Sequence, residues 1–125
     1  MIKLLLVGAG GFLGSVSRYA VSGLVYRIAG NSHFPYGTLA VNVAGCLFIG
    51  LLGGLAESRQ LFNPEIRLLI FIGFLGGFTT FSTFGYEVFS FARDGQIAAS
   101  LSNILLHVIL GLGATWGGYA ISRLV

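Results

Sequence analysis

The sequence predicts an all-α integral membrane protein with four transmembrane helices. Of its 125 residues, 55% are hydrophobic, only 9% are charged, and 20 are glycine. A soluble domain carries about 25% charged residues, because polar side chains must cover its surface. The composition therefore excludes a soluble globular domain and a disordered chain. It also excludes a nucleic-acid partner, since seven Lys and Arg against four acids form no basic cluster.

Long apolar segments divide the chain into four candidate spans within a single transmembrane domain, residues 1–125. A bilayer span needs about 20 mostly apolar residues. We expect spans at 4–26, 36–56, 66–92 and 96–122. Polar loops separate them. The loop before the third span ends in Asn63 and Pro64, which suit the N-cap and the first position of a helix.

Each predicted span carries one Gly-x-x-x-Gly pair. Small residues four apart lie on one helix face and let two helix backbones approach closely. The pairs are Gly10/Gly14, Gly50/Gly54, Gly73/Gly77 and Gly113/Gly117. Because four short helices make few internal contacts, we expect some of these faces to pack against a second subunit.

The positive charges are divided almost evenly between the two ends of the predicted bundle. With four spans, the N-terminus, the second loop and the C-terminus share one side of the membrane. That side holds Lys3, Arg59, Arg67 and Arg123, and the other side holds Arg27 and Arg93. Orientation normally follows a clear Lys/Arg excess on the cytoplasmic side. We hypothesise that the chain inserts in both orientations and forms a dual-topology, antiparallel homodimer.

The third span is unusually polar at its centre. Gly76 and Gly77 are followed closely by Thr79 and Thr80, and both residue types weaken a helix. We expect a break there that frees backbone carbonyls, which is tolerated only inside protein or beside a cavity. Freed carbonyls and hydroxyls suit a hard cation such as Na+. The alternative is an unbroken helix with small packing residues.

Aromatic and amide side chains at membrane depth are candidates for an anion path. Phe81 and Phe84 share a helix face, and the positive edges of their rings can favour an anion. Both could instead be ordinary core aromatics. Asn42, one turn after Thr38 in the second span, offers two N–H donors to an anion. Its alternative role is a hydrogen bond between helices.

Polar residues also occur inside the first and fourth spans. Ser100, Asn103 and His107 step by three and four residues, so they form one polar stripe. His107 could be a satisfied core histidine or part of an aqueous path. Arg18 is a charge inside the first span, where it should find a partner or face water. It could raise the anion concentration at a pore mouth or pair with Glu87.

These residues resemble the sequence patterns of a known family, the Fluc/CrcB fluoride channels. The segment GGFTTFSTF at 76–84, followed by Glu87, closely resembles the family's third-helix signature. The stretch 35–39 with Asn42 is similar to its second-helix pattern, and 10–19 is similar to its first. The resemblance covers the whole chain, although the fourth span matches only loosely.

The resemblance implies a fluoride-selective channel that acts as an antiparallel homodimer with two anion pores. Its implied partners are fluoride, a second copy of the chain and membrane lipid, in the inner (plasma) membrane of the cell. The implied pore residues are Phe81, Phe84, Asn42, Thr38, Ser82, Thr83, Asn103 and His107. Arg18 would lie in the vestibule. Backbone carbonyls of Gly76 and Thr79, from both subunits, would hold a structural Na+ at the dimer centre.

Two other functions are open alternatives. A small four-helix multidrug transporter also forms antiparallel dimers, and it needs a membrane-embedded carboxylate to couple protons to a cationic substrate. Glu87 is the candidate for that role. A non-transporting assembly subunit would need no polar motif at mid-membrane. No ATP-binding motif and no nucleophile–base spacing occurs, so we expect neither an energy-driven pump nor an enzyme.

Overall fold

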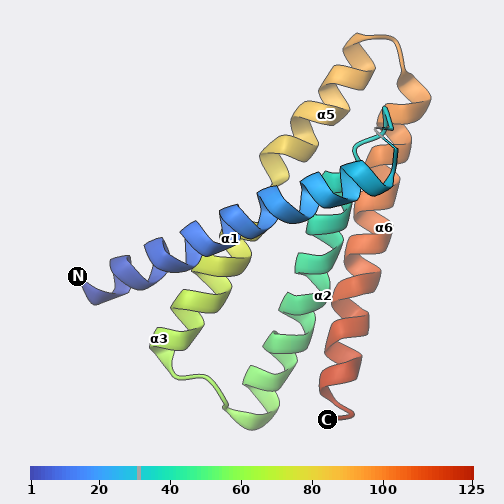
Figure 1. Ribbon diagram of the computed structural model, residues 1–125. Helices are drawn as coiled ribbons and strands as arrows, with labels where there is room; N and C mark the ends of the chain where they lie inside the picture. Colours follow the sequence, from blue (N-terminus) through green and yellow to red (C-terminus); the bar gives the residue numbers. More distant parts are fainter. Residues whose placement is uncertain (31) are drawn as a thin grey trace.

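The computed structural model describes residues 1–30 and 32–125, and the regular secondary structure of this part is all helical (Figure 1). Helix α1 covers Ile2–Ile28, α2 covers Tyr36–Arg59, and α6 covers Ile97–Ser122. The third span consists of α3 (Pro64–Arg67), the π-helical stretch η1 (Leu68–Leu75), α4 (Gly76–Phe78) and α5 (Phe81–Arg93). The predicted all-α fold is confirmed.

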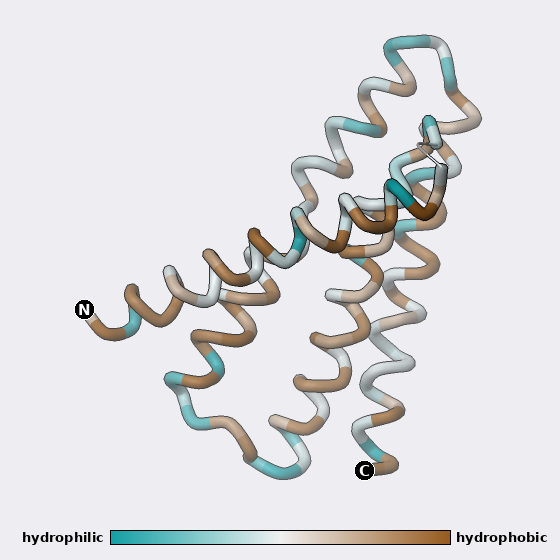
Figure 2. Tube along the Cα trace, in the orientation of Figure 1, coloured by the Kyte–Doolittle hydropathy of each residue, from teal (hydrophilic) through white to brown (hydrophobic). Residues whose placement is uncertain are grey.

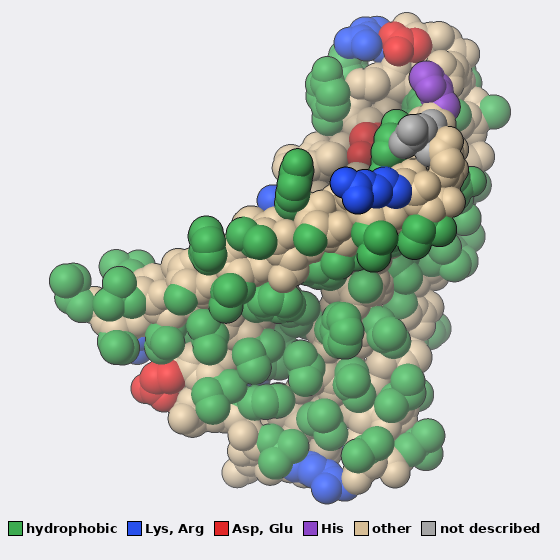
Figure 3. Space-filling view, viewed as in Figure 1, with side chains coloured by type: hydrophobic (Ala, Val, Ile, Leu, Met, Phe, Trp, Pro, Cys, Tyr) green, Lys and Arg blue, Asp and Glu red, His purple; other side chains and the backbone are tan. Residues whose placement is uncertain are grey.

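Four helical segments of the described chain are long and apolar enough to cross a bilayer. They run over Ile2–Ile28, Tyr36–Arg59, Pro64–Arg93 and Ile97–Ser122. In Figure 2 the helices are largely brown (hydrophobic), and many of the teal residues lie at turns and chain ends. Figure 3 shows hydrophobic side chains spread over the visible face with few charged ones among them. The four-span prediction is confirmed, and the chain is a multi-pass membrane protein.

The third span begins as the sequence indicated. The Asn63 side chain accepts a hydrogen bond from the Ile66 backbone N–H at 2.8 Å, and Pro64 occupies the first helical position. This cap satisfies one of the N–H groups that the first turn of a helix leaves without a partner.

Glycines allow the closest approaches between helices. Helix α1 packs across η1 and α4, and a Cβ added at Gly10 would lie 2.8 Å from the backbone nitrogen of Phe74. Helices α2 and α6 lie side by side (Figure 1), and a Cβ at Gly118 would lie 2.8 Å from the backbone nitrogen of Leu51. Real Cβ atoms do not approach backbone this closely, so only glycine fits at both positions.

Three of the four glycine pairs pack against neighbouring helices within the single chain, and the fourth pair does not. Gly10/Gly14, Gly50/Gly54 and Gly73/Gly77 all face neighbouring helices closely. Gly113 and Gly117, in contrast, face open space, with no heavy atom of the described chain within 4 Å of an added Cβ. The face of α6 that packs on α2 carries the buried glycines Gly111 and Gly118 instead. The rotation of α6 about its own axis decides which of its glycines face α2, and the spacing of glycines in the sequence does not determine that rotation.

The third span is broken, as expected, but the break falls after the predicted glycines. Gly76 and Gly77 are helical in α4, whereas Thr79 (φ −86°, ψ 159°) and Thr80 (φ −150°, ψ 109°) are extended. Gly77 stays helical because it packs on the backbone of Gly11, where an added Cβ would lie 2.6 Å from the carbonyl oxygen. Gly77 therefore serves packing, and the two β-branched threonines carry the break.

Candidate functional site

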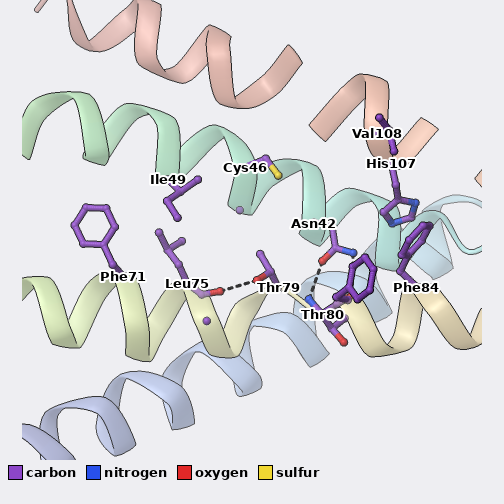
Figure 4. Close-up of a pocket in the computed structure, with 13 residues that line it drawn as sticks. Asn42, Cys46, Ile49, Phe71, Leu75, Thr79, Thr80, Phe84, His107 and Val108 are labelled. Atoms are coloured by element: carbon purple, nitrogen blue, oxygen red, sulfur yellow. Dashed lines mark hydrogen bonds between the residues drawn. The ribbon is translucent and has the colours of Figure 1, made fainter. Parts of the chain in front are cut away.

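The helix break opens onto a cavity of about 400 Å³ between α2, the third span and α6 (Figure 4). Its lining includes five of the residues singled out by the sequence together with Gly76. The five are Asn42, Thr79, Phe81, Phe84 and His107. Apolar side chains such as Ile49, Phe71 and Leu75 line the remainder, so the cavity has a polar part at the break and an apolar part beyond it.

Asn42 bonds to the broken segment through both ends of its amide. Its Nδ2 donates to the Thr80 carbonyl at 3.1 Å, and its Oδ1 accepts from the Thr80 N–H at 2.8 Å (Figure 4). In a continuous helix the Thr80 N–H would donate to the carbonyl of Gly76, four residues earlier. Asn42 therefore takes the place of a helical partner and leaves the Gly76 carbonyl without that donor. Because an amide has two N–H groups, one remains for an ion.

Arg18 contacts the break from the α1 side. Its Nη1 donates to the Thr79 carbonyl at 3.3 Å, which satisfies a backbone acceptor that the break exposes. The pairing of Arg18 with Glu87 that the sequence allowed is not formed. Glu87 instead accepts a hydrogen bond from the hydroxyl of Thr38. Arg18 and Glu87 are therefore bonded to different partners, the Thr79 carbonyl and the Thr38 hydroxyl.

Thr80, which the sequence indicated only as a helix-weakening residue of the break, has a second role that was not predicted. Its side chain accepts from the Thr83 N–H at 3.3 Å and caps α5, while its own hydroxyl donates to the Thr83 hydroxyl at 2.9 Å. A threonine three residues before a second threonine, at the start of a helical pattern, is the signal that could have identified it. Ser82 lies beside this cap, 3.4 Å from the Thr80 hydroxyl, and is exposed.

Three rings follow one another at the cavity. The ring centroids of Phe81 and Phe84 are 5.5 Å apart at an interplanar angle of 55°, and Phe84 lies 4.3 Å from the His107 ring. Phe81 is 82% exposed in the single chain, which is unusual for a core aromatic. The rings are tilted relative to one another rather than stacked face to face. The positive edge of such a ring can favour an anion.

Helices α5 and α6 also carry buried polar atoms without hydrogen-bond partners in the described chain. Asn103 is fully buried, and neither end of its amide has a hydrogen-bond partner within the described chain. The same holds for Nε2 of His107 and Oε2 of Glu87, whereas Nδ1 of His107 lies 3.0 Å from the Asn103 carbonyl. Buried polar atoms are normally paired, so this group stands out as able to bind an ion or water.

A second, more polar cavity of about 400 Å³ lies between α1, α2 and the start of α5. Hydroxyl groups dominate its lining together with one guanidinium. The lining residues are Ser15, Arg18, Tyr19, Ser22, Thr38, Val41, Thr80 and Thr83. The predicted pore residues are therefore divided between two cavities that meet at Thr80. Asn103 and Ser82 line neither of them.

These features define a class of protein: a helical membrane protein whose broken third span lines polar cavities, as in proteins that move ions or solutes. The family model described as CrcB-like protein, Camphor Resistance (CrcB), matches residues 5–119. The chain belongs to this CrcB family.

Several relatives match along nearly their whole length. A protein of Maridesulfovibrio salexigens is 48% identical over 125 residues, covering 100% of this chain and 98% of its own. A protein of Geobacter sulfurreducens is 46% identical, covering 98% of each chain, and one of Methylobacillus flagellatus is 40% identical, covering 99% and 97%. Each of the three bears the name fluoride-specific ion channel FluC.

Proposed function

We propose that this chain forms a fluoride-selective ion channel that exports F− passively and so lowers cytoplasmic fluoride. The observation that carries the proposal is the full-length similarity to relatives named as fluoride-specific channels. The arrangement of Asn42, Phe81, Phe84 and His107 around one cavity supports it independently. The bacterial relatives favour the inner membrane, and a channel needs no catalytic residues.

The selectivity for fluoride depends on the free energy needed to remove water from a small anion. Fluoride is strongly hydrated, so a pore must supply close donors where the water is removed. The unused N–H of Asn42 and the ring edges of Phe81 and Phe84 are such donors. Chloride is larger and makes poorer contacts in the same narrow path. Arg18, at the hydroxyl-lined cavity, raises the local anion concentration.

The working unit in this proposal is an antiparallel homodimer with two pores. The exposed Phe81 ring and the open face at Gly113 and Gly117 support it, since a second copy can cover both. Trp116, on the same helix, is 78% exposed. The near balance of cations at the two ends of the chain supports insertion in both orientations.

A structural Na+ at the dimer centre fits the oxygen atoms at the break. The Gly76 carbonyl has lost its helical donor to Asn42, and the Thr79 carbonyl has a second lone pair besides the one that faces Arg18. Hard cations prefer such oxygen ligands. Bound there, Na+ would neutralise carbonyl dipoles that meet at the centre of the membrane.

The surroundings of Glu87 argue against the multidrug-transporter alternative. A coupling carboxylate must reach its cationic substrate, but Glu87 is hydrogen-bonded to Thr38 and has one buried oxygen.

Fluoride efflux from liposomes tests the proposed function. Purified protein reconstituted into vesicles loaded with KF or KCl, in valinomycin, should release F− without releasing Cl−. The same assay with Na+ replaced by N-methylglucamine during purification should give slower F− release if the ion is structural. Proton-coupled transport of an organic cation without F− release would contradict the channel and support the transporter.

A further inference from the structure

A separate groove lies at the end of the molecule where α1 and the third span begin. It has a volume of about 550 Å³. Its surface is almost entirely apolar: it is lined by Pro64, Leu68, Phe71 and Ile72 together with the aliphatic parts of Lys3 and Arg67. Figure 1 shows the N-terminal end of α1 and helix α3 on the same side of the molecule. Apart from Phe71, the groove shares no lining residue with the cavities at the break.

The two cations of this groove have no partner among the described carboxylates. Within residues 1–30 and 32–125, the ion pair formed within 4.0 Å is that of Arg93 with Asp94, at the opposite end. Lys3 and Arg67 are both exposed. Glu65 lies two residues before Arg67 in the same helix and forms no ion pair with it, so Lys3 and Arg67 still leave a net positive charge beside the groove. A net positive charge favours an anion there.

The order of charge and apolar surface matches the depth profile of a lipid. Lys3 lies in the first turn of its span and Arg67 near the start of the third, so both sit at headgroup level. Leu68, Phe71 and Ile72 follow deeper along the same helix, and Ile72 is 59% exposed. An anionic head therefore meets positive charge where an acyl chain meets apolar surface.

We propose that this groove binds one anionic phospholipid, with its phosphate on Lys3 and Arg67 and an acyl chain along Leu68, Phe71 and Ile72. Basic pockets between transmembrane helices hold acidic headgroups. The site is independent of ion conduction, so it stands whether or not the chain conducts fluoride.

A second copy of the chain is a poorer occupant because its charges do not complement the groove. In an antiparallel pair the opposite end would approach, and that end carries Arg27, Arg93 and Asp94. Asp94 is already paired with Arg93. The approaching end is therefore neutral or positive, whereas a phosphodiester carries the missing negative charge.

The single tryptophan of the chain permits a direct test. In a Trp116→Phe, Ile72→Trp variant the only indole lies at the groove, and brominated lipids quench indole fluorescence on contact. We expect brominated phosphatidylglycerol to quench at a mole fraction at least about fivefold lower than brominated phosphatidylcholine. Adding Lys3→Gln and Arg67→Gln should remove that preference.

The matched control changes the same number of charges at the same end of the molecule. Arg59→Gln with Arg123→Gln removes two cations outside the groove and should leave the preference intact. Equal quenching by the two lipids, an equal loss in the control, or no quenching by either lipid would each overturn the proposal. Native mass spectrometry of the chain with Trp116 retained gives a second readout: it should hold phosphatidylglycerol, and Lys3→Gln with Arg67→Gln should release it.

Discussion

Asn42 shows what a single residue adds to this fold. The sequence placed an amide at membrane depth but left two roles open, an anion donor and a bond between helices. The structure has the amide bonded to both backbone groups of Thr80, so the interhelical role is present, and one N–H remains for the proposed ion. No pattern in the sequence could have identified Thr80 as the partner, because that pairing depends on how two helices are rotated.

Replacing Asn42 by Ala should impair both the break and conduction. The change leaves the Thr80 N–H and C=O without their partner, at a loss of roughly 1–3 kcal/mol of stability. A lost donor of this size should slow F− efflux about tenfold or more. Thermal unfolding in detergent and the liposome assay measure the two effects.

The control for Asn42 is Cys46→Ala, one turn later on α2. Cys46 lines the same cavity and is a free thiol. The Cys46→Ala change should leave F− efflux and thermal stability nearly unchanged. Equal losses in the two variants would mean that the cavity is sensitive to any change in its packing, and would remove the special role from Asn42.

The aromatic pair can be tested in the same way. Phe84→Leu removes the ring that lies beside both Phe81 and His107, so F− efflux should fall about tenfold if ring edges replace hydration. Phe89→Leu is the control, since Phe89 is on the same helix and 58% exposed but does not line the cavity. Full efflux in Phe84→Leu would take this ring out of the proposed pore.

At the scale of a helix, the third span separates what local sequence predicts from what packing decides. The cap at Asn63 and the presence of a break were both predictable, because capping and helix propensity are local properties. Which of the residues from Gly76 to Thr80 leave the helix was not predictable, since Gly77 is held in a helix by the backbone of Gly11, far away in the sequence. Tertiary packing thus overrides the weak helix propensity of glycine.

Gly77→Ala should therefore destabilise the protein through a clash between helices. An added Cβ would lie 2.6 Å from the Gly11 carbonyl oxygen, and overpacking of this kind costs about 1–3 kcal/mol. Gly53→Ala is the matched change in open space and should be neutral or slightly stabilising. Thermal unfolding of both variants decides: an unaffected Gly77→Ala would mean that α1 and α4 can separate at little cost.

At the scale of the whole molecule, the number and order of the spans followed from hydropathy alone. Which faces meet did not, as the open face at Gly113 and Gly117 illustrates. A Gly-x-x-x-Gly pair predicts a close-packing face but does not identify its partner, which can be the same chain or another copy. That face and the exposed Trp116 beside it are available for contact with a second copy in the proposed antiparallel dimer.

The charge balance gives a test of that dimer that does not depend on any pore residue. Arg27→Gln with Arg93→Gln leaves four cations at one end and none at the other, so all copies should insert in one orientation. Parallel copies cannot form an antiparallel pair, and F− efflux from cells should be lost. The opposite variant, Lys3→Gln with Arg59→Gln and Arg123→Gln, leaves one cation against two and should favour the reverse orientation.

Co-expression of the two variants completes the test. Each alone should be inactive, whereas together they supply both orientations and should restore efflux, because neither set of changes touches a residue lining the cavities at the break. Impermeant labelling of a Leu124→Cys, in a Cys46→Ala background, checks the orientation of each variant. Activity in a variant whose label is reached from one side only would show that a single orientation suffices, and the antiparallel dimer would then be wrong.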